Sequence, residues 1–239
     1  MKKIILIILF ILFNIQLSYA RPVSKVYRAD SRPPEEVFKK GFVAWGNNIN
    51  FHSHVNGVSG RRGSKDSAFI PTTSSFKSSE KFAKDLLNVS SENKSYIYKI
   101  RATNNFYSAL ETVYYYHDKI KERVSDVLRS VLTEEQEYSA YINIPNQLIE
   151  LVTIYTKEGS EILEETMVNP HYSPEKTYSS DEPYKGYNPL KIDNLPHLVM
   201  GLSMTNINNE LAEASAVLPS SSFTWGSVLS TVMEVAEAL

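Results

Sequence analysis

Two hydrophobic periodicities alternate along this chain, and they limit the folds it can adopt more than any other feature. Segments with a period of two, as in strands that bury one face, alternate with segments that carry helix signals. The expected strands are 25–30, 96–102, 135–145 and 148–155. The expected helices are 33–40, 79–87 and 107–132. This mixture predicts an α+β fold.

The remaining segments carry no clear period. Residues 46–67 are rich in Gly, Asn and Ser and predict a long loop, whereas residues 67–75 look like a strand interrupted by Pro71. From about residue 166 onward, prolines and tyrosines punctuate an irregular stretch. We therefore expect a core over residues 21–165 and a C-terminal appendage over residues 166–239.

The N-terminal segment has the order of a secretory signal peptide. Two lysines precede an aliphatic run over residues 4–13, and residues 18–20 have the small-x-small pattern of a cleavage site. The run is too short for a transmembrane helix. The sequence therefore predicts a signal peptide over residues 1–20 and a soluble, exported mature chain that begins at Arg21.

Composition excludes several classes of function. The chain contains no cysteine, which excludes thiol catalysis, thiolate metal sites and disulfides. Its 25 lysines and arginines stand against 27 aspartates and glutamates, and loss of the two signal-peptide lysines would bring the net charge to −4. A weakly acidic domain has no general electrostatic reason to bind nucleic acid.

The most informative motif is the pair Glu135 and Glu137. On a strand, these carboxylates would project from one face together with Ser139, and their repulsion would raise at least one pKa. Such pairs can stabilise a developing oxocarbenium ion and orient a nucleophile, which is what cleavage of a glycosidic bond requires. The alternative is a solvated turn at a helix end, where negative charge is unfavourable.

His52 and His54 would lie on one side of an extended segment. Two histidines are too few for a zinc site, and no third ligand stands at a suitable spacing, so no metal is expected. Both a hydrogen-bonding histidine in a polar cleft and an exposed loop histidine stay open.

Arg28 stands at the end of a predicted strand, just before a turn into a helix. There it can clamp a phosphate or a carboxylate, or it can pair with Asp30 or Glu35. The hydroxyl side chains at 72–74 are either cleft groups or strand-edge residues.

Four segments in this order resemble the enzymatic subunit of pertussis-like toxins, within the wider pertussis and cholera group of ADP-ribosylating exotoxins. They read VYRADSRPPEEVFKKGFVAWGNN, SAFIPTTSS, YIYKIRATNNFYSA and EEQEYSAYINIP, and they cover about residues 25–155. The resemblance implies two small sheets flanked by helices around an NAD cleft. It also implies transfer of ADP-ribose from NAD to a host protein, often the α subunit of a heterotrimeric G protein, with release of nicotinamide.

The resemblance further implies roles for individual residues. Glu137 matches the catalytic glutamate, His54 matches the cleft histidine, and Glu135 would bind and activate the acceptor. The residues expected to bind NAD are Arg28, Asp30, Thr72, Thr73 and Ser74.

Three positions depart from the family pattern. Pro71 stands where a Ser-Thr-Ser motif has its first serine, so a hydroxyl at 72–74 is left to bond to Glu137. Glu135 replaces the glutamine of pertussis-type chains and resembles the cholera-like, arginine-modifying branch, which favours an arginine acceptor. Gly60 stands where the first cysteine of the family disulfide would be, so activation by reduction is not implied.

Three functional hypotheses follow. The first is an exported mono-ADP-ribosyltransferase toxin subunit that acts inside the host cell. The second is an NAD glycohydrolase with water as the acceptor, and the third is a binding subunit without activity, for which Pro71 argues. Family context also implies docking on a ring of non-enzymatic binding subunits through the appendage, with residues 225–239 as a candidate contact.

Overall fold

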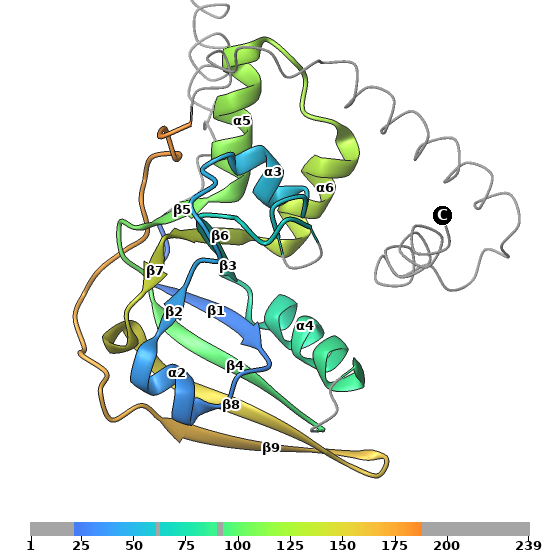
Figure 1. Cartoon of the computed structure of the whole chain (residues 1–239), viewed down its shortest axis with the longest axis vertical. Coiled ribbons are helices and arrows are strands. Elements are labelled where there is room, and N and C mark those ends of the chain that lie inside the picture. The colour runs from blue at the N-terminus through green and yellow to red at the C-terminus, as the bar shows by residue number, and fades with distance from the viewer. Residues whose placement is uncertain (1–21, 61–62, 90–92, 188–239) are drawn as a thin grey trace, which may run out of the picture. The chain divides into compact units, whose positions relative to one another are not determined.

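Strands and helices alternate along the part of the chain that the computed structural model describes, residues 22–60, 63–89 and 93–187 (Figure 1). The expected signal peptide and the candidate contact at 225–239 lie outside these residues. The strands are β1 (Lys25–Asp30), β2 (Phe42–Val43), β3 (Phe69–Thr73), β4 (Lys94–Arg101), β5 (Phe106–Ser108), β6 (Glu137–Tyr141), β7 (Asn143–Ile144), β8 (Ile149–Glu158) and β9 (Glu161–Val168). The helices are α2 (Pro34–Lys40), α3 (Phe51–Val55), α4 (Phe76–Val89), α5 (Ala109–Ile120) and α6 (Asp126–Glu135), with a 3-10 turn over Asn146–Leu148. The predicted α+β class is confirmed.

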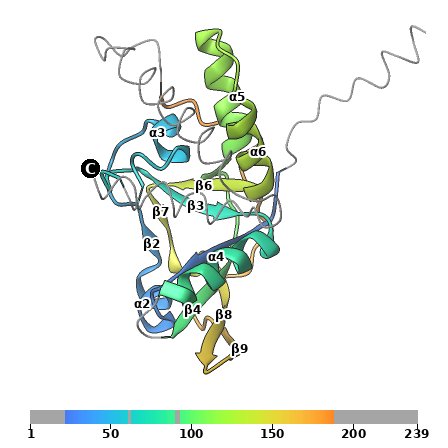
Figure 2. The same ribbon diagram turned by 90° about the vertical axis from the view of Figure 1, so that its right-hand side faces the viewer.

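The main sheet is antiparallel and opens into two halves. Its order is β5-β6-β3-β1-β4-β8-β9, and β2 and β7 form a separate ribbon. β1 and β4 pair over six residue pairs, whereas β1 and β3 are in register at one pair, Tyr27 with Thr73. Figures 1 and 2 show β3, β5 and β6 beside α3, α5 and α6, and β1, β4 and β8 beside α4. The junction between β1 and β3 is therefore where the two halves part.

The largest apolar cluster spans both halves of the sheet, since it joins Val26 on β1 with Ile70 on β3, and each half also has a cluster of its own. On the side of α3, α5 and α6, the buried residues include Phe51, Phe69 and Val113. On the side of α4, Leu87 packs with Ile97. Burying one such side chain stabilises the fold by about 1.5–3 kcal/mol, and in a chain without cysteine this burial takes the place of disulfides.

The helix expected over 107–132 is two helices. α5 ends where Lys121 adopts a left-handed conformation (φ 59°), and Ser125 caps α6 by accepting a hydrogen bond from the backbone N–H of Leu128. Val127, in the first turn of α6, is 57% exposed.

The strand expected from residue 135 begins two residues later. Glu135 is the last residue of α6, Gln136 is its C-cap in a left-handed conformation (φ 49°), and β6 starts at Glu137. The prediction that Glu135 and Glu137 share a strand face is therefore wrong. The alternative interpretation, in which Glu135 lies at the end of a helix, agrees with the structure.

The segment expected to be a long loop contains α3. Asn50 caps this short helix by accepting a hydrogen bond from the backbone N–H of Ser53. Residues two apart on a helix point about 200° away from each other. His52 and His54 therefore face different surroundings, and the prediction that they share one side is wrong.

Regular structure continues past the boundary expected at residue 165. β9 forms a hairpin with β8 through Gly159 (φ 63°), and all of its residues are exposed. Residues 169–187 then run back along the core, where Ser179 N–H donates to Val23 O and Ser180 N–H donates to Phe106 O. The described core thus extends to residue 187.

Candidate active site

Arg28 lies in the opening between β1 and β3. Its Nη1 donates to the carbonyl oxygen of Pro71 at 2.7 Å, so a side chain joins the two strands where backbone pairing is missing. In a strand, the backbone nitrogen and the carbonyl oxygen of one residue point toward the same neighbouring strand. The nitrogen of Pro71 therefore faces the opening, where there is no strand partner for an N–H, and a proline is tolerated there. For this reason β3 is continuous from Phe69 to Thr73, and the predicted interruption at Pro71 is absent.

Two arginines hold the carboxylate of Asp30. Arg28 Nε and Nη2 lie 3.1 and 3.0 Å from Oδ2, and Arg32 Nε lies 2.8 Å from Oδ1. Burial alone would raise the pKa of Asp30, but the bond to Arg32 and the charges of both arginines outweigh it and lower the pKa to about 2. Both guanidinium groups also lie over the ring of Phe42, at 5.2 and 4.9 Å from its centroid.

Glu137 stands at the first residue of β6 with its carboxylate nearly buried. Its Oε1 lies 3.0 Å from His54 Nε2 and also accepts a hydrogen bond from Ser139 Oγ. Burial raises the pKa of Glu137, but contact with His54 and Ser139 and the charge of Arg28 lower it below its usual value. Burial lowers the pKa of Arg28, while the charges of Asp30 and Glu137 oppose this shift, so Arg28 and Glu137 interact electrostatically across the opening.

His54 reaches the site from α3 and is held at both ring nitrogens. Nδ1 lies 2.8 Å from Ser67 Oγ, and Nε2 lies 3.0 Å from Glu137 and 3.2 Å from Ser139 Oγ. Since an ionised carboxylate can only accept hydrogen bonds, the hydrogen between His54 and Glu137 belongs to Nε2. Ser67 can then donate to Nδ1 while it accepts from the backbone N–H of Phe69.

The hydroxyls at 72–74 bind the backbone that carries Glu137, and not its carboxylate. Thr72 Oγ1 donates to the carbonyl oxygen of Tyr138, and Thr73 Oγ1 donates to that of Glu135 at 2.6 Å. Ser74 Oγ lies 3.4 Å from the carbonyl oxygen of Gln136. The prediction that one of them bonds to Glu137 is wrong, because Thr73 and Ser74 bond to the backbone just before Glu137 and Thr72 bonds to the backbone just after it.

Glu135 occupies a different electrostatic environment from Glu137. Burial, together with the charges of Glu137 and Glu134, raises the pKa of Glu135 to about 7. Near neutral pH one carboxylate is therefore ionised, while the other is divided between its two protonation states. Such a difference in pKa allows two neighbouring carboxylates to play different roles in one reaction.

His52 does not join this group. Its ring centroid lies 5.7 Å from that of His117 on α5. Burial and the nearness of His117 lower the pKa of His52. Across residues 22–60, 63–89 and 93–187 we find no cluster of three or more His, Asp or Glu side chains that could hold a metal. The same ranges include no helix with the length and apolarity needed to cross a bilayer.

Residues 21–193 match the family described as pertussis toxin, subunit 1. The chain belongs to this family. It is 36% identical over 176 residues to pertussis toxin subunit 1 of Bordetella pertussis, an alignment that covers 68% of this chain and 65% of that protein. The chain thus spans about two thirds of the length of this relative.

Further relatives support the same placement. The ADP-ribosylating toxin CARDS of Mycoplasma pneumoniae is 28% identical over 196 residues, covering 68% of this chain and 32% of that one. A solved chain named EcPltA superposes with a TM-score of 0.63 at 32% identity, covering 69% of this chain and 96% of that chain. The resemblance to the pertussis and cholera group and the ADP-ribosyltransferase fold are thereby confirmed.

Three side chains near the opening were assigned no role from the sequence. Ser67 and Ser139 contact His54 and Glu137, and Arg32 contacts Asp30. Ser139 could have been found, because it lies two residues after Glu137 on the same strand face. Ser67 could not, since its place next to His54 depends on how α3 packs. The family motif has a serine at the position of Pro71. In this pertussis toxin subunit 1 family member, Pro71 on β3 is paired with Ser139 on β6, so Ser139 supplies a hydroxyl at nearly the same place.

Proposed function

We propose that this chain transfers ADP-ribose from NAD to a host protein as the enzymatic subunit of an exported toxin. The observation that carries the proposal is the meeting of Arg28, His54 and Glu137 at the β1–β3 opening of a pertussis toxin subunit 1 family member. One relative is named an ADP-ribosylating toxin, and such toxins use NAD as co-substrate.

The arginines would hold the pyrophosphate of NAD. Side-chain exposure is 15% for Arg28 and 37% for Arg32, so both cations are fixed and still reachable. The Asp30 oxygens already accept hydrogen bonds from both. Asp30 therefore acts by orienting the two guanidinium groups, and Thr72, Thr73 and Ser74 act by fixing the backbone on both sides of Glu137.

Glu137 would stabilise the transition state. Its Oε1 is occupied by His54 and Ser139, and within the described ranges Oε2 accepts no hydrogen bond, which leaves it for a ribose hydroxyl. As the bond between the ribose carbon and the nicotinamide nitrogen breaks, its electron pair goes to nicotinamide and positive charge develops on the ribose. An ionised carboxylate beside that charge lowers the barrier.

Glu135 would receive the acceptor. An arginine side chain must lose one proton when its nitrogen bonds to the ribose carbon, and a carboxylate with a pKa of about 7 can take that proton near neutral pH. Its charged form also pairs with a guanidinium by charge and geometry. We therefore favour arginine over cysteine as the modified residue.

The two alternatives differ in support. Loss of the motif serine at Pro71 argued for an inactive subunit, but Ser139 supplies a hydroxyl to Glu137 and weakens that argument. NAD glycohydrolysis stays an alternative, since half-protonated Glu135 could equally take a proton from water.

The names of the relatives support proposals about partners and location. Two of the relatives are named as subunits, of pertussis toxin and of cholera enterotoxin. We propose a signal peptide over residues 1–20, action inside the host cell on a protein such as a G protein α subunit, and docking on a ring of binding subunits through the C-terminal appendage, residues 166–239, with 225–239 as the candidate contact.

A labelled-NAD assay tests the proposal. Purified chain from Arg21 onward should release nicotinamide and transfer label to a host lysate protein, and mass spectrometry of that protein should place the modification on arginine. Release without labelled protein would favour the glycohydrolase. Neither release nor label, from protein with a folded spectrum, would remove the enzyme claim.

A further inference from the structure

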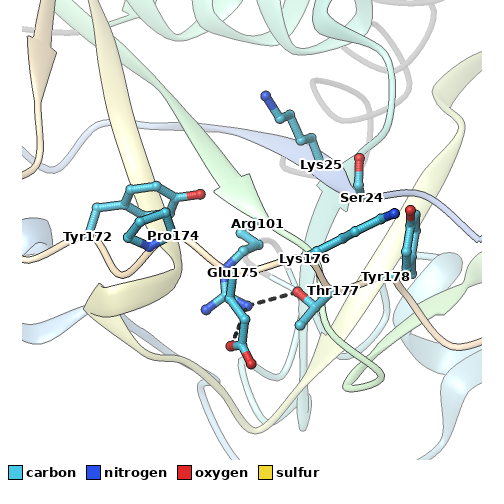
Figure 3. Close-up of a pocket in the computed structure, with 9 residues that line it drawn as sticks. All are labelled: Ser24, Lys25, Arg101, Tyr172, Pro174, Glu175, Lys176, Thr177 and Tyr178. Carbon is cyan, nitrogen blue, oxygen red and sulfur yellow. Dashed lines mark hydrogen bonds and ion pairs between the residues drawn. The ribbon is translucent and has the colours of Figure 1, made fainter.

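A cavity of about 430 Å³ lies at the end of β1 remote from Arg28. Lys25 begins β1 and is in register with Arg101 at the end of β4. The segment 172–178 covers these strand ends and completes the lining, and Figure 3 shows the side chains. We call this cavity the Arg101 pocket. Its lining residues are Ser24, Lys25, Arg101, Tyr172, Pro174, Glu175, Lys176, Thr177 and Tyr178.

Arg101 is a buried cation with an incomplete set of partners. The residue is 6% exposed, and Nη1 donates to Glu175 at 3.1 Å and to Thr177 Oγ1 at 2.8 Å. Its Nε is buried without a hydrogen-bond partner among the described residues. Buried polar atoms in folded proteins nearly always have a partner, so this guanidinium, which belongs to a residue that lines the pocket, has unused capacity to donate hydrogen bonds.

The carboxylate that now faces Arg101 is easily displaced. The side chain of Glu175 is 67% exposed and comes from an irregular segment. A ligand oxygen can replace this one, because the buried guanidinium keeps an anionic partner when the two are exchanged.

The charge of the lining favours an anion. Among the described lining residues, three are cationic (Lys25, Arg101 and Lys176) and one is anionic (Glu175). The pocket is thus locally positive, although the formal charge of the whole chain is −2. Lys25 also lies 3.6 Å from Glu150 outside the pocket, which leaves Arg101 and Lys176 as its main cations. Arginine and lysine together suit a phosphate group, which offers several acceptor oxygens.

The rest of the lining favours a flat apolar group attached to that phosphate. Tyr172, Pro174 and Tyr178 line the pocket, and Figure 3 shows Tyr172 and Tyr178 on opposite sides of Arg101. We propose that the Arg101 pocket is a second ligand site, which takes a small molecule that carries a phosphate and a ring and whose phosphate replaces Glu175 at Arg101. This proposal does not depend on the proposed enzymatic function.

Titration calorimetry of the full exported chain with inorganic phosphate and with phenyl phosphate tests the proposal. Phenyl phosphate should bind more tightly than phosphate, because its ring meets the tyrosines. Glu175→Gln should strengthen binding and Lys176→Gln should weaken it, each by about threefold, since a competing or a supporting charge is removed. Lys185→Gln, an exposed lysine on the same segment that pairs with Glu182, should leave binding unchanged.

Three outcomes would overturn the proposal. One is the absence of saturable binding by either anion up to about 10 mM. Another is equal weakening by Lys176→Gln and Lys185→Gln, which would mean nonspecific attraction. The third is weakening by Arg28→Lys with no effect of Lys176→Gln, which would place the phosphate at the other end of β1. Arg101→Gln protein that keeps its circular dichroism spectrum should not bind phenyl phosphate.

Discussion

His54 Nε2 lies 3.0 Å from Glu137 Oε1, although 83 residues separate the two along the chain. His54 comes from α3 and Glu137 from β6, so the contact exists only when α3 packs on the half of the sheet that contains β3 and β6. Ser67 fixes the other side of the imidazole at 2.8 Å. The carboxylate is thereby oriented before any ligand arrives, and this preorganisation is the basis of the predictions that follow.

Glu137→Gln should lower the rate of nicotinamide release by about 10²–10³-fold, because a neutral amide does not stabilise the positive charge on the ribose. The rate is measured with labelled NAD at saturating concentration. Glu134→Gln is the matched control, since the side chain of Glu134 is 59% exposed and bonds to Lys81. Comparable rates for the two variants would contradict the role given to Glu137.

Ser139→Ala should slow the reaction about tenfold, because a hydrogen bond to a charged group is lost. The donor also favours the ionised carboxylate. Without it the pKa of Glu137 rises, and the acid limb of the pH–rate profile moves to higher pH. Ser95→Ala is the control, since Ser95 is equally buried and its hydroxyl has no hydrogen-bond partner among the described residues. If both variants keep the wild-type pH profile, Ser139 has no part in catalysis.

Transfer to a simple guanidine acceptor should increase as the pH rises through about 7, because Glu135 becomes ionised there. Glu135→Gln should show low transfer without this step, while nicotinamide release in the absence of acceptor is retained. Product is followed by mass spectrometry between pH 5.5 and 8.5, a window of about 1.5 units on either side of that pKa. A pH step that persists in Glu135→Gln would assign it to another group.

The same carboxylate should make the protein less stable at high pH. The folded-state pKa of Glu135 is raised, so its contribution is fully present below the unfolded-state value near 4.5 and is lost as the pH rises through about 7. Glu135→Gln should therefore be more stable than wild type at pH 8, by about 2 kcal/mol because the side chain is partly exposed, and nearly equal at pH 4. Urea unfolding at both pH values measures the difference. An equal difference at the two pH values would exclude this explanation.

Asp30 should have the opposite pH dependence. Its folded-state pKa is lowered from 3.8 to about 2, so its contribution is present above pH 4 and is lost as the pH falls through 2. The loss amounts to about 2 kcal/mol and should be absent in Asp30→Asn. That variant should also be less stable at pH 7, since two arginines lose their shared carboxylate. Unfolding curves at pH 4, 3 and 2 that fall in parallel for the two proteins would rule this out.

Sequence patterns located elements that bury one face and missed those that do not. β4 buries almost all of its side chains and β1 buries or half-buries all but its first, and both strands were predicted. β9 was missed because all of its residues are exposed, and α3 was missed because five residues are too few to show a helical period. The break between α5 and α6 was missed because Lys121 gives no signal for a left-handed conformation.

The sequence by itself determined the α+β class, the family and the segments that carry Arg28, His54 and Glu137, because these depend on local periodicity and on residue order. Tertiary structure alone decided which hydroxyl binds Glu137, that Glu135 ends a helix, and that the pKa values of the two glutamates move in opposite directions. The physical reason is that desolvation and hydrogen bonding depend on distances between groups that are remote in sequence, and folding alone sets those distances.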